Sequence, residues 1–116
     1  MKKIHTKNVI SVGFYRRDQW PLLLETANDR KAIEDTYDEW MLSVEKCLKK
    51  MQSSGVEPVK VDVDMNELLL WLKSRGMKNT GKARAAFIAE LCREGRGKKM
   101  ILTNFRDNAF ILINDE

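Results

Sequence analysis

Charged side chains gather where two expected strands end, and the chain could bind a small anion there. The stretch 8–15 ends in Tyr15-Arg16-Arg17, and the stretch 56–64 ends in Asp62-Val63-Asp64. Guanidinium groups bind phosphates and carboxylates through paired hydrogen bonds, and ligands collect beyond the carboxyl ends of parallel strands in open α/β sheets. The candidate anion-binding residues are Tyr15, Arg16, Arg17, Asp62, Asp64 and Arg84.

The same residues also have a purely structural interpretation, which is favoured. Aspartate is a common N-cap, so Asp18 and Asp64 could simply begin helices while the arginines pair with them or lie in solvent. Arg84 falls inside the apolar arc of its own expected helix. Its long side chain could extend outward along its stem or reach the strand-end site.

A basic helix provides a second candidate site. In the stretch "KNTGKARAAFIAELCREGRGKK" (78–99), helical spacing places Lys82 and Arg93 together beside alanines, so this ridge could approach a phosphate backbone closely. The candidate nucleic-acid-binding residues are Lys82, Arg93, Arg96, Lys98 and Lys99. Alanines rather than amides separate the charges, which predicts phosphate contacts without base readout. The alternative is a solvated basic face.

Residues that could carry out enzymatic chemistry are sparse. The single histidine, His5, precedes the first expected strand, and motifs for a serine nucleophile, a Walker loop or a zinc protease are absent from the sequence. Asp35, Asp38 and Glu39 cluster at a helix start, where the helix dipole favours acids without any metal. We therefore predict no catalytic residue, no metal site and no cofactor.

Charge is distributed unevenly along the 116 residues, whose net charge is +4. Residues 18–45 carry eight acids and two bases, a net of −6, whereas residues 72–99 carry nine bases and two acids, a net of +7. Such asymmetry indicates either an anionic partner such as nucleic acid or an acidic helix lying beside a basic one.

Length and composition favour one globular domain over residues 1–116, with 1–7 as a flexible extension. The longest apolar runs, 68–72 and 109–113, are too short to span a bilayer, so no membrane association is expected. The first ten residues lack the apolar segment of a signal peptide, which favours the cytoplasm. Cys47 and Cys92 lack CxxC spacing and are expected to be reduced, buried thiols.

The elements that would position these residues follow from apolar periodicity and caps. Strands are expected at 8–15 and 56–64, with Val59, Val61 and Val63 on one side of the second. Between them, a helix begins at Asp18 with Pro21 in its first turn, 28–35 forms a loop, and a helix runs from a Thr36 and Glu39 capping box to Gly55.

The second half of the chain continues the pattern. A helix follows Asp64 and ends at Gly76, and another begins at Asn79 or Thr80 and runs to about Glu94. Residues 95–99 are expected to form a glycine-rich loop, followed by a hairpin of strands 100–105 and 109–114.

The order β-α-α-β-α-α-β-β predicts a single-domain α/β fold. The first two strands would be parallel through a right-handed crossover, and the C-terminal hairpin would extend the sheet. Trp40 and Trp71 lie in apolar helical stripes and should be largely buried. The apolar run 109–113 suits a strand covered on both faces, and a second copy could supply that cover, so a homodimer is expected.

The pattern from Gly13 to Glu90 resembles small bacterial proteins of unknown function. The shared features are an aromatic-Arg strand end, a D-T-Y-x-E-W helix start and a V-x-V-D strand end in the same order, covering about two-thirds of the chain. These motifs are mostly caps and core positions, so the resemblance implies no functional role. The tail from Gly95 to Glu116 takes no part in it.

Three functions therefore stand as hypotheses. The first is a non-enzymatic cytoplasmic binding module whose basic surface, residues 72–99, meets an anionic partner such as nucleic acid. The second is a protein-interaction module that pairs through its C-terminal hairpin. The third is an enzyme that acts on a small anionic substrate at the strand-end Arg/Asp edge.

Overall fold

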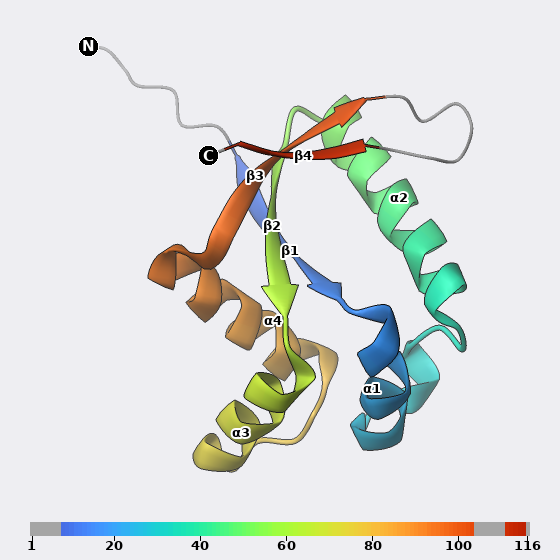
Figure 1. Cartoon of the computed structure of the whole chain (residues 1–116), viewed down its shortest axis with the longest axis vertical. Coiled ribbons are helices and arrows are strands. Elements are labelled where there is room, and N and C mark those ends of the chain that lie inside the picture. The colour runs from blue at the N-terminus through green and yellow to red at the C-terminus, as the bar shows by residue number, and fades with distance from the viewer. Residues whose placement is uncertain (1–7, 104–110, 116) are drawn as a thin grey trace.

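A four-stranded sheet with helices on both faces forms the molecule in our computed structural model, which describes residues 8–103 and 111–115 (Figure 1). Side chains are described from Asn8 to Met100. The elements are β1 (Val9–Tyr15), α1 (Trp20–Thr26), α2 (Tyr37–Ser53), β2 (Glu57–Val63), α3 (Met65–Arg75), α4 (Gly81–Leu91), β3 (Gly97–Thr103) and β4 (Ile111–Asp115), with 3-10 turns at Arg17–Gln19 and Arg30–Ala32 and a π turn at Cys92–Arg96.

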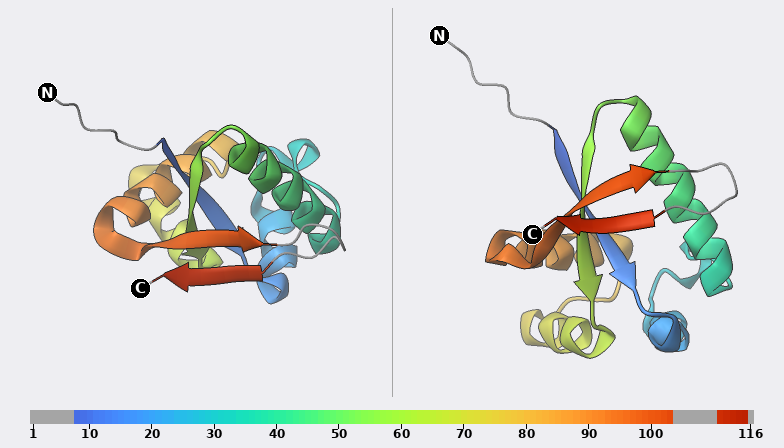
Figure 2. Two further views of the ribbon diagram at one scale, coloured as in Figure 1. Left: turned by 90° about the horizontal axis from the view of Figure 1, so that it is seen from above. Right: turned by 45° about the horizontal axis from the view of Figure 1, so that its top comes forward.

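The strands lie in the sheet in the order in which they occur in the sequence, β1-β2-β3-β4. β1 is parallel to β2, and β2 is antiparallel to β3, with Lys60 opposite Lys98. β3 and β4 run antiparallel side by side (Figure 2). The predicted α/β fold, with a parallel first pair and a C-terminal hairpin, is confirmed.

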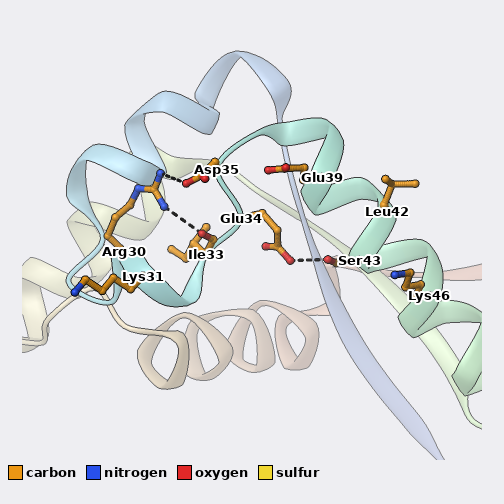
Figure 3. A pocket seen from close by; sticks show the side chains of 9 residues that line it. All are labelled: Arg30, Lys31, Ile33, Glu34, Asp35, Glu39, Leu42, Ser43 and Lys46. Atoms are coloured by element: carbon orange, nitrogen blue, oxygen red, sulfur yellow. Dashed lines mark hydrogen bonds and ion pairs between the residues drawn. The ribbon is translucent and has the colours of Figure 1, made fainter.

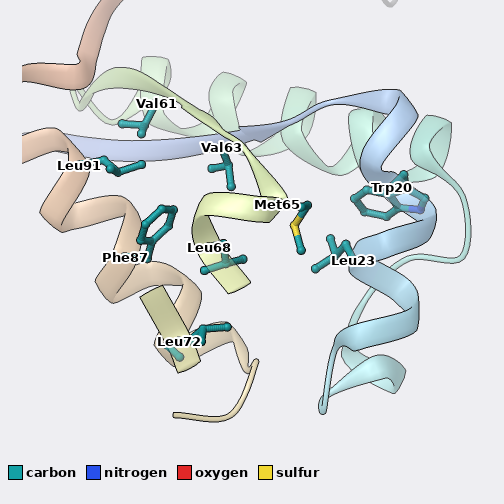
Figure 4. Packing of buried hydrophobic residues seen from close by; sticks show 10 residues of the cluster. Trp20, Leu23, Val61, Val63, Met65, Leu68, Leu72, Phe87 and Leu91 are labelled. Atoms are coloured by element: carbon teal, nitrogen blue, oxygen red, sulfur yellow. The ribbon is translucent and has the colours of Figure 1, made fainter. Parts of the chain in front are cut away.

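The two faces of the sheet bury different helices because side chains alternate along a strand. On one face, Val61 and Val63 pack with Phe87 and Leu91 of α4, in the larger core that also includes α1 and α3 (Figure 4). At Gly13 this packing is so close that a Cβ atom would overlap the Ile88 side chain. A larger residue at this position would force the end of the Ile88 side chain to move.

The opposite face is covered by α2. Phe14 of β1 and Met100 of β3 pack there with Val44 and Leu48. The predicted capping box is present, because Thr36 Oγ1 accepts from the N–H of Glu39 and the Glu39 carboxylate accepts from the N–H of Thr36. This reciprocal cap sets the first residue of α2 and thereby the register of its apolar stripe.

Caps also fix the helices that follow β2. Asp64 caps α3, Gly76 ends it in the left-handed conformation at φ 63°, and Thr80 rather than Asn79 caps α4. Asp18, by contrast, is not a cap. A 3-10 turn occupies Arg17–Gln19, so α1 begins at Trp20 and Asp18 instead pairs with Arg16 on the surface.

Other sequence predictions need correction. The expected loop 95–99 is wrong in its second half, because Gly97–Thr103 is a strand: Gly97 lies opposite Val61 and fits closely against Val59. The prediction of two buried thiols is wrong, because Cys47 is exposed and Cys92 is only partly buried; both are free.

The tryptophans differ in burial. Trp40 and Trp71 pack against the core but keep partial exposure, and Trp20, at 4% exposed, is the most deeply buried of the three. The expected turn of the hairpin, 106–108, and the side chains of 109–113 lie outside the described residues. No helix in the described ranges is long and apolar enough to cross a bilayer.

Candidate functional site

The two arginines that follow β1 lie on the surface and each has an acidic partner. Arg16 Nε lies 3.6 Å from an oxygen of Asp18, and Arg17 Nη2 lies 2.7 Å from Asp38. The Arg17 guanidinium also stacks over the Tyr37 ring, 4.6 Å from its centroid. These side chains are more than half exposed, so solvent weakens both ion pairs.

The start of α3 at the same edge is capped from within the chain. The Asp64 carboxylate accepts from the N–H of Asn66 at 2.9 Å and from Gln19 Nε2 at 3.2 Å. The buried Gln19 also accepts from the N–H of Met65 through its Oε1, at 2.8 Å. The Asn66 N–H and then the Gln19 amide hold the pKa of Asp64 below its usual range. Internal groups therefore satisfy N–H groups that an external anion would otherwise bind.

Arg84 has a complete set of partners inside the protein. Its guanidinium forms a two-pronged pair with Asp29, at 3.0 Å to Oδ1 and 2.9 Å to Oδ2, and donates to the side-chain oxygen of Asn79 at 2.8 Å. Asp29 in turn accepts from the N–H of Gly81, at the start of α4, at 2.8 Å. The hydrogen bond from Arg84 lowers the pKa of Asp29, although burial opposes this shift.

This polar cluster joins two loops that are distant in the sequence. Asn79 Nδ2 donates to Thr26 Oγ1 at 3.1 Å, and the backbone N–H groups of Asn28 and Asn79 donate to oxygens of each other's residue. The loop after α1 is thereby fixed to the loop before α4. We call the set of Asp29, Asn79 and Arg84 the internal clamp.

The structure brings together only part of the predicted strand-end set. Tyr15 lies near Arg84: burial raises the pKa of the phenol, and the positive charge of Arg84 acts against that rise. Asp62 faces the opposite side of the sheet, is exposed and lies 3.7 Å from Lys60. Tyr15, Asp64 and Arg84 are thus engaged internally, whereas Arg16, Arg17 and Asp62 lie outside in surface pairs.

The carboxyl end of β1 is also tied to an aromatic cluster. Neighbouring rings in this cluster lie 5.3 to 6.2 Å apart between centroids, and its members are Phe14, Tyr15, Trp20, Tyr37 and Trp40. The Tyr37 hydroxyl donates to the backbone carbonyl of Tyr15 at 2.8 Å. Four of these six ring pairs are edge-to-face, a geometry that adds stability beyond the area that is buried, so the end of β1 is held firmly.

The basic surface is divided between paired and unpaired cations. Arg96 makes a two-pronged pair with Glu67, at 2.8 and 3.2 Å, and Lys99 lies 3.7 Å from Glu57. Lys82, Arg93 and Lys98 are exposed and form no ion pair within the described residues. Of the five residues predicted to bind nucleic acid, these three keep their charge available.

A small hollow lies beside Lys82. It measures about 330 Å³ and is lined by Met77, Lys78, Thr80, Lys82, Ala83 and Ala86. Its lining is largely apolar, with one methionine and two alanines, and includes two lysines. Lys82 was predicted from the sequence, but Met77 and Lys78 were not, because they precede the helix and carry no periodic signal.

A larger hollow of about 820 Å³ separates the loop after α1 from the outer side of α2 (Figure 3). Four of its polar residues are paired with one another: Arg30 lies 2.8 Å from Asp35, and the Ser43 hydroxyl donates to Glu34. Asp35 therefore faces Arg30, Asp38 faces Arg17, and Glu39 caps α2. Within residues 8–100, no three potential metal ligands converge.

No family model, curated protein or solved structure matches the chain at a significant level. The resemblance to small bacterial proteins therefore stays a prediction, and function has to be inferred from the arrangement of the side chains.

Proposed function

We propose that the protein is a non-enzymatic binding module whose α4 surface engages an anionic partner such as nucleic acid. The supporting observation is a contrast in pairing. Every arginine in the described residues except Arg93 has an acidic partner. The cations without one include five between α3 and β3: Lys73, Lys78, Lys82, Arg93 and Lys98.

The spacing of two unpaired cations suits an extended polyanion. Lys82 lies in the first turn of α4, and Arg93 lies eleven positions later in the π turn that follows the helix. Eleven positions correspond to about 16 Å along a helix axis. That length corresponds to about five nucleotides at the rise of one strand in a duplex. The hollow beside Lys82 adds apolar lining residues and two lysines, a combination that suits a base or sugar next to its phosphate.

Binding of this kind should depend strongly on salt. A fluorescently labelled oligonucleotide titrated at several salt concentrations should give a log K that falls with log salt by about 0.7 to 0.9 per phosphate neutralised. Lys82→Ala and Arg93→Ala should each reduce that slope by about one and weaken binding to all base sequences alike.

Lys46→Ala is the matched control. Lys46 is another exposed helical lysine without an ion pair among the described residues, but it lies on α2. Removing it changes the net charge by the same amount as Lys82→Ala. Equal losses in the two variants, or no binding even at low salt, would overturn the proposal.

A second candidate function is protein interaction through the C-terminal hairpin, with a homodimer as its simplest form. The supporting observation is that β4 is the last strand of the sheet and pairs only with β3 among the described strands. An edge strand offers its unpaired backbone groups to another chain. Light scattering at tens of micromolar should then give twice the monomer mass, and a monomeric mass would contradict this candidate.

We further propose that the protein acts in the reducing environment of the cytoplasm. Cys47 and Cys92 are free thiols, and Cys47 is exposed. An exposed thiol persists where disulfides are kept reduced.

A further inference from the structure

β1 is an edge strand whose outer side is open along most of its length. It pairs with β2 alone among the described strands. The N–H and C=O of one residue point to the same side of a strand, and successive residues point to opposite sides. The Asn8 carbonyl accepts from the N–H of Glu57. The backbone N–H and C=O groups of residues 10, 12 and 14 therefore also point toward β2. The backbone groups of Val9, Ser11 and Gly13 therefore face away from the sheet.

One end of this edge is closed and the other is not. Tyr15 also faces outward, but its carbonyl is taken by the Tyr37 hydroxyl. In the part of the chain that the structure describes, no hydrogen bond is made by the outward groups of Val9, Ser11 and Gly13. The sequence of β1 contains neither a charged residue nor a proline, which are the usual protections of an exposed edge.

A hollow of about 290 Å³ lies beside the open part of this edge. Ile10 of β1 forms one wall, and Cys47, Lys50, Met51 and Ser54 on one side of α2 form the other, with Val56 following the helix. The hollow therefore lies between the first half of β1 and the last turns of α2, on the face of the sheet that α2 covers. Ile10 is 45% exposed there, and Val9 is 52% exposed on the other face of the strand.

We propose that β1 binds an extended peptide segment of a partner protein, which adds to the sheet as a fifth strand. Hydrogen bonds to Val9, Ser11 and Gly13 would align the peptide, and one apolar side chain would enter the hollow between Ile10 and Met51. Lys50 is exposed at the rim without an ion pair in the described residues, so an acidic residue of the peptide belongs next to it. Backbone pairing supplies affinity in this mode and the hollow supplies specificity.

The open edge has a direct spectroscopic signature in the free protein. The amides of Ser11 and Gly13 should exchange with solvent deuterium at least about tenfold faster than those of Ile10 and Val12, which donate to β2. Slow exchange at Ser11 and Gly13 in the free chain would mean that the edge is already occupied, by a second copy or by another part of this chain, and would overturn the proposal.

Binding itself can be tested with a panel of capped hexapeptides. Each peptide begins with aspartate, alternates threonine with an apolar residue, and carries valine, leucine or phenylalanine at the apolar positions. The best binder should shift the amide signals of Val9, Ser11 and Gly13 in NMR titrations. Methylating its alternate backbone nitrogens should weaken binding by about tenfold or more, because several hydrogen bonds are lost. Replacing its aspartate by lysine should weaken binding through Lys50.

Two protein variants test whether the peptide binds at the edge of β1. Ser11→Pro removes an outward N–H without touching the bonds to β2, and edge strands tolerate proline at such positions. It should abolish peptide binding, whereas Ser11→Ala, which keeps the N–H, should bind normally. If Ser11→Pro does not fold, Lys50→Glu provides the test, since it should reverse the preference between the aspartate and lysine peptides.

Several results would contradict the proposal. They are the absence of binding by every peptide of the panel at millimolar concentration, equal binding by Ser11→Pro and Ser11→Ala, and shifts confined to α4. Because Lys82 and Arg93 are not involved, their alanine variants should bind the peptides normally, so failure of oligonucleotide binding and failure of peptide binding are independent outcomes.

Discussion

Replacing Asp29 by asparagine should destabilise the protein by about 2 to 3 kcal/mol. Removing one partner of a buried ion pair costs about 3 to 5 kcal/mol, because the other charge is left without compensation. Here the Arg84 side chain is only 9% exposed, but the Asp29 side chain is 25% exposed. Solvent therefore reaches the pair from the Asp29 side and reduces the loss. Arg84 also keeps its hydrogen bonds to Asn79 in the variant.

The reverse change, Arg84→Met, should cost about 2 kcal/mol. It removes the bonds to Asn79, at about 1 kcal/mol each, while Asp29 retains the N–H of Gly81 and access to water. The double variant should be more stable than the sum of the single losses predicts, by about 1 to 2 kcal/mol, because the two residues contact each other directly.

Urea unfolding at neutral pH, followed through tryptophan fluorescence, measures these free energies. Asp38→Asn is the control, since it breaks the surface pair with Arg17, whose side chains are 66% and 77% exposed. That variant should change the free energy of unfolding by less than about 0.5 kcal/mol. If Asp29→Asn costs no more than Asp38→Asn, or if the Asp29 and Arg84 losses are additive, the internal clamp does not stabilise the fold in the way described.

Three further measurements test the Asp29 contact at low pH and two other contacts. The pKa of Asp29 in the folded protein lies below its ordinary value of 3.8. The stabilisation that its carboxylate provides is therefore complete above about pH 4 and is lost as the pH falls through the folded-state pKa. In urea unfolding below about pH 4, the free energy of unfolding of Asp29→Asn should decline less steeply than that of the wild type. Gln19→Ala should cost about 1 to 2 kcal/mol in the same assay, since the buried N–H of Met65 loses its acceptor. Gly97→Ala should cost about 1 to 3 kcal/mol, because a Cβ atom there would lie 2.5 Å from Val59 Cγ1; thermal unfolding no lower than wild type would show that the contact relaxes freely.

Local signals in the sequence predicted the local features of the fold well. The Thr36 and Glu39 pair set the start of α2, and Gly76 set the end of α3, because both depend on backbone groups within a few residues. Asp18 misled for a related reason: a capping residue type cannot by itself distinguish a 3-10 turn from the first turn of an α-helix. The glycines and lysines of 95–99 suggested a loop, but pairing with β2, which is distant in the sequence, makes Gly97 the start of a strand.

The geometry of the candidate site could not be predicted in the same way, because it depends on contacts between residues that are distant in the sequence. Arg84 was singled out because it lies inside an apolar arc, yet its partner Asp29 is 55 positions away in an otherwise unremarked loop. Gln19 caps α3 across 46 positions, and no periodicity marks it. The pairing of the basic residues also depends on tertiary packing. Arg96 and Lys99 have acidic partners because packing brings Glu67 and Glu57 close to them, whereas Lys82 and Arg93 have none among the described residues.

The order of the strands has a consequence for how the chain folds. β1 and β2 form the only parallel pair among the described strands, and the chain must pass through α1 and α2 before β2 can meet β1. Closing so long a loop costs entropy before any packing is gained, which makes this pairing the slow event. During synthesis, β1 remains without a partner until β2 has left the ribosome. Until that point, the backbone groups on both edges of this uncharged strand are unpaired. Refolding rates should respond more to changes that stiffen the loop between α1 and α2 than to changes within β4.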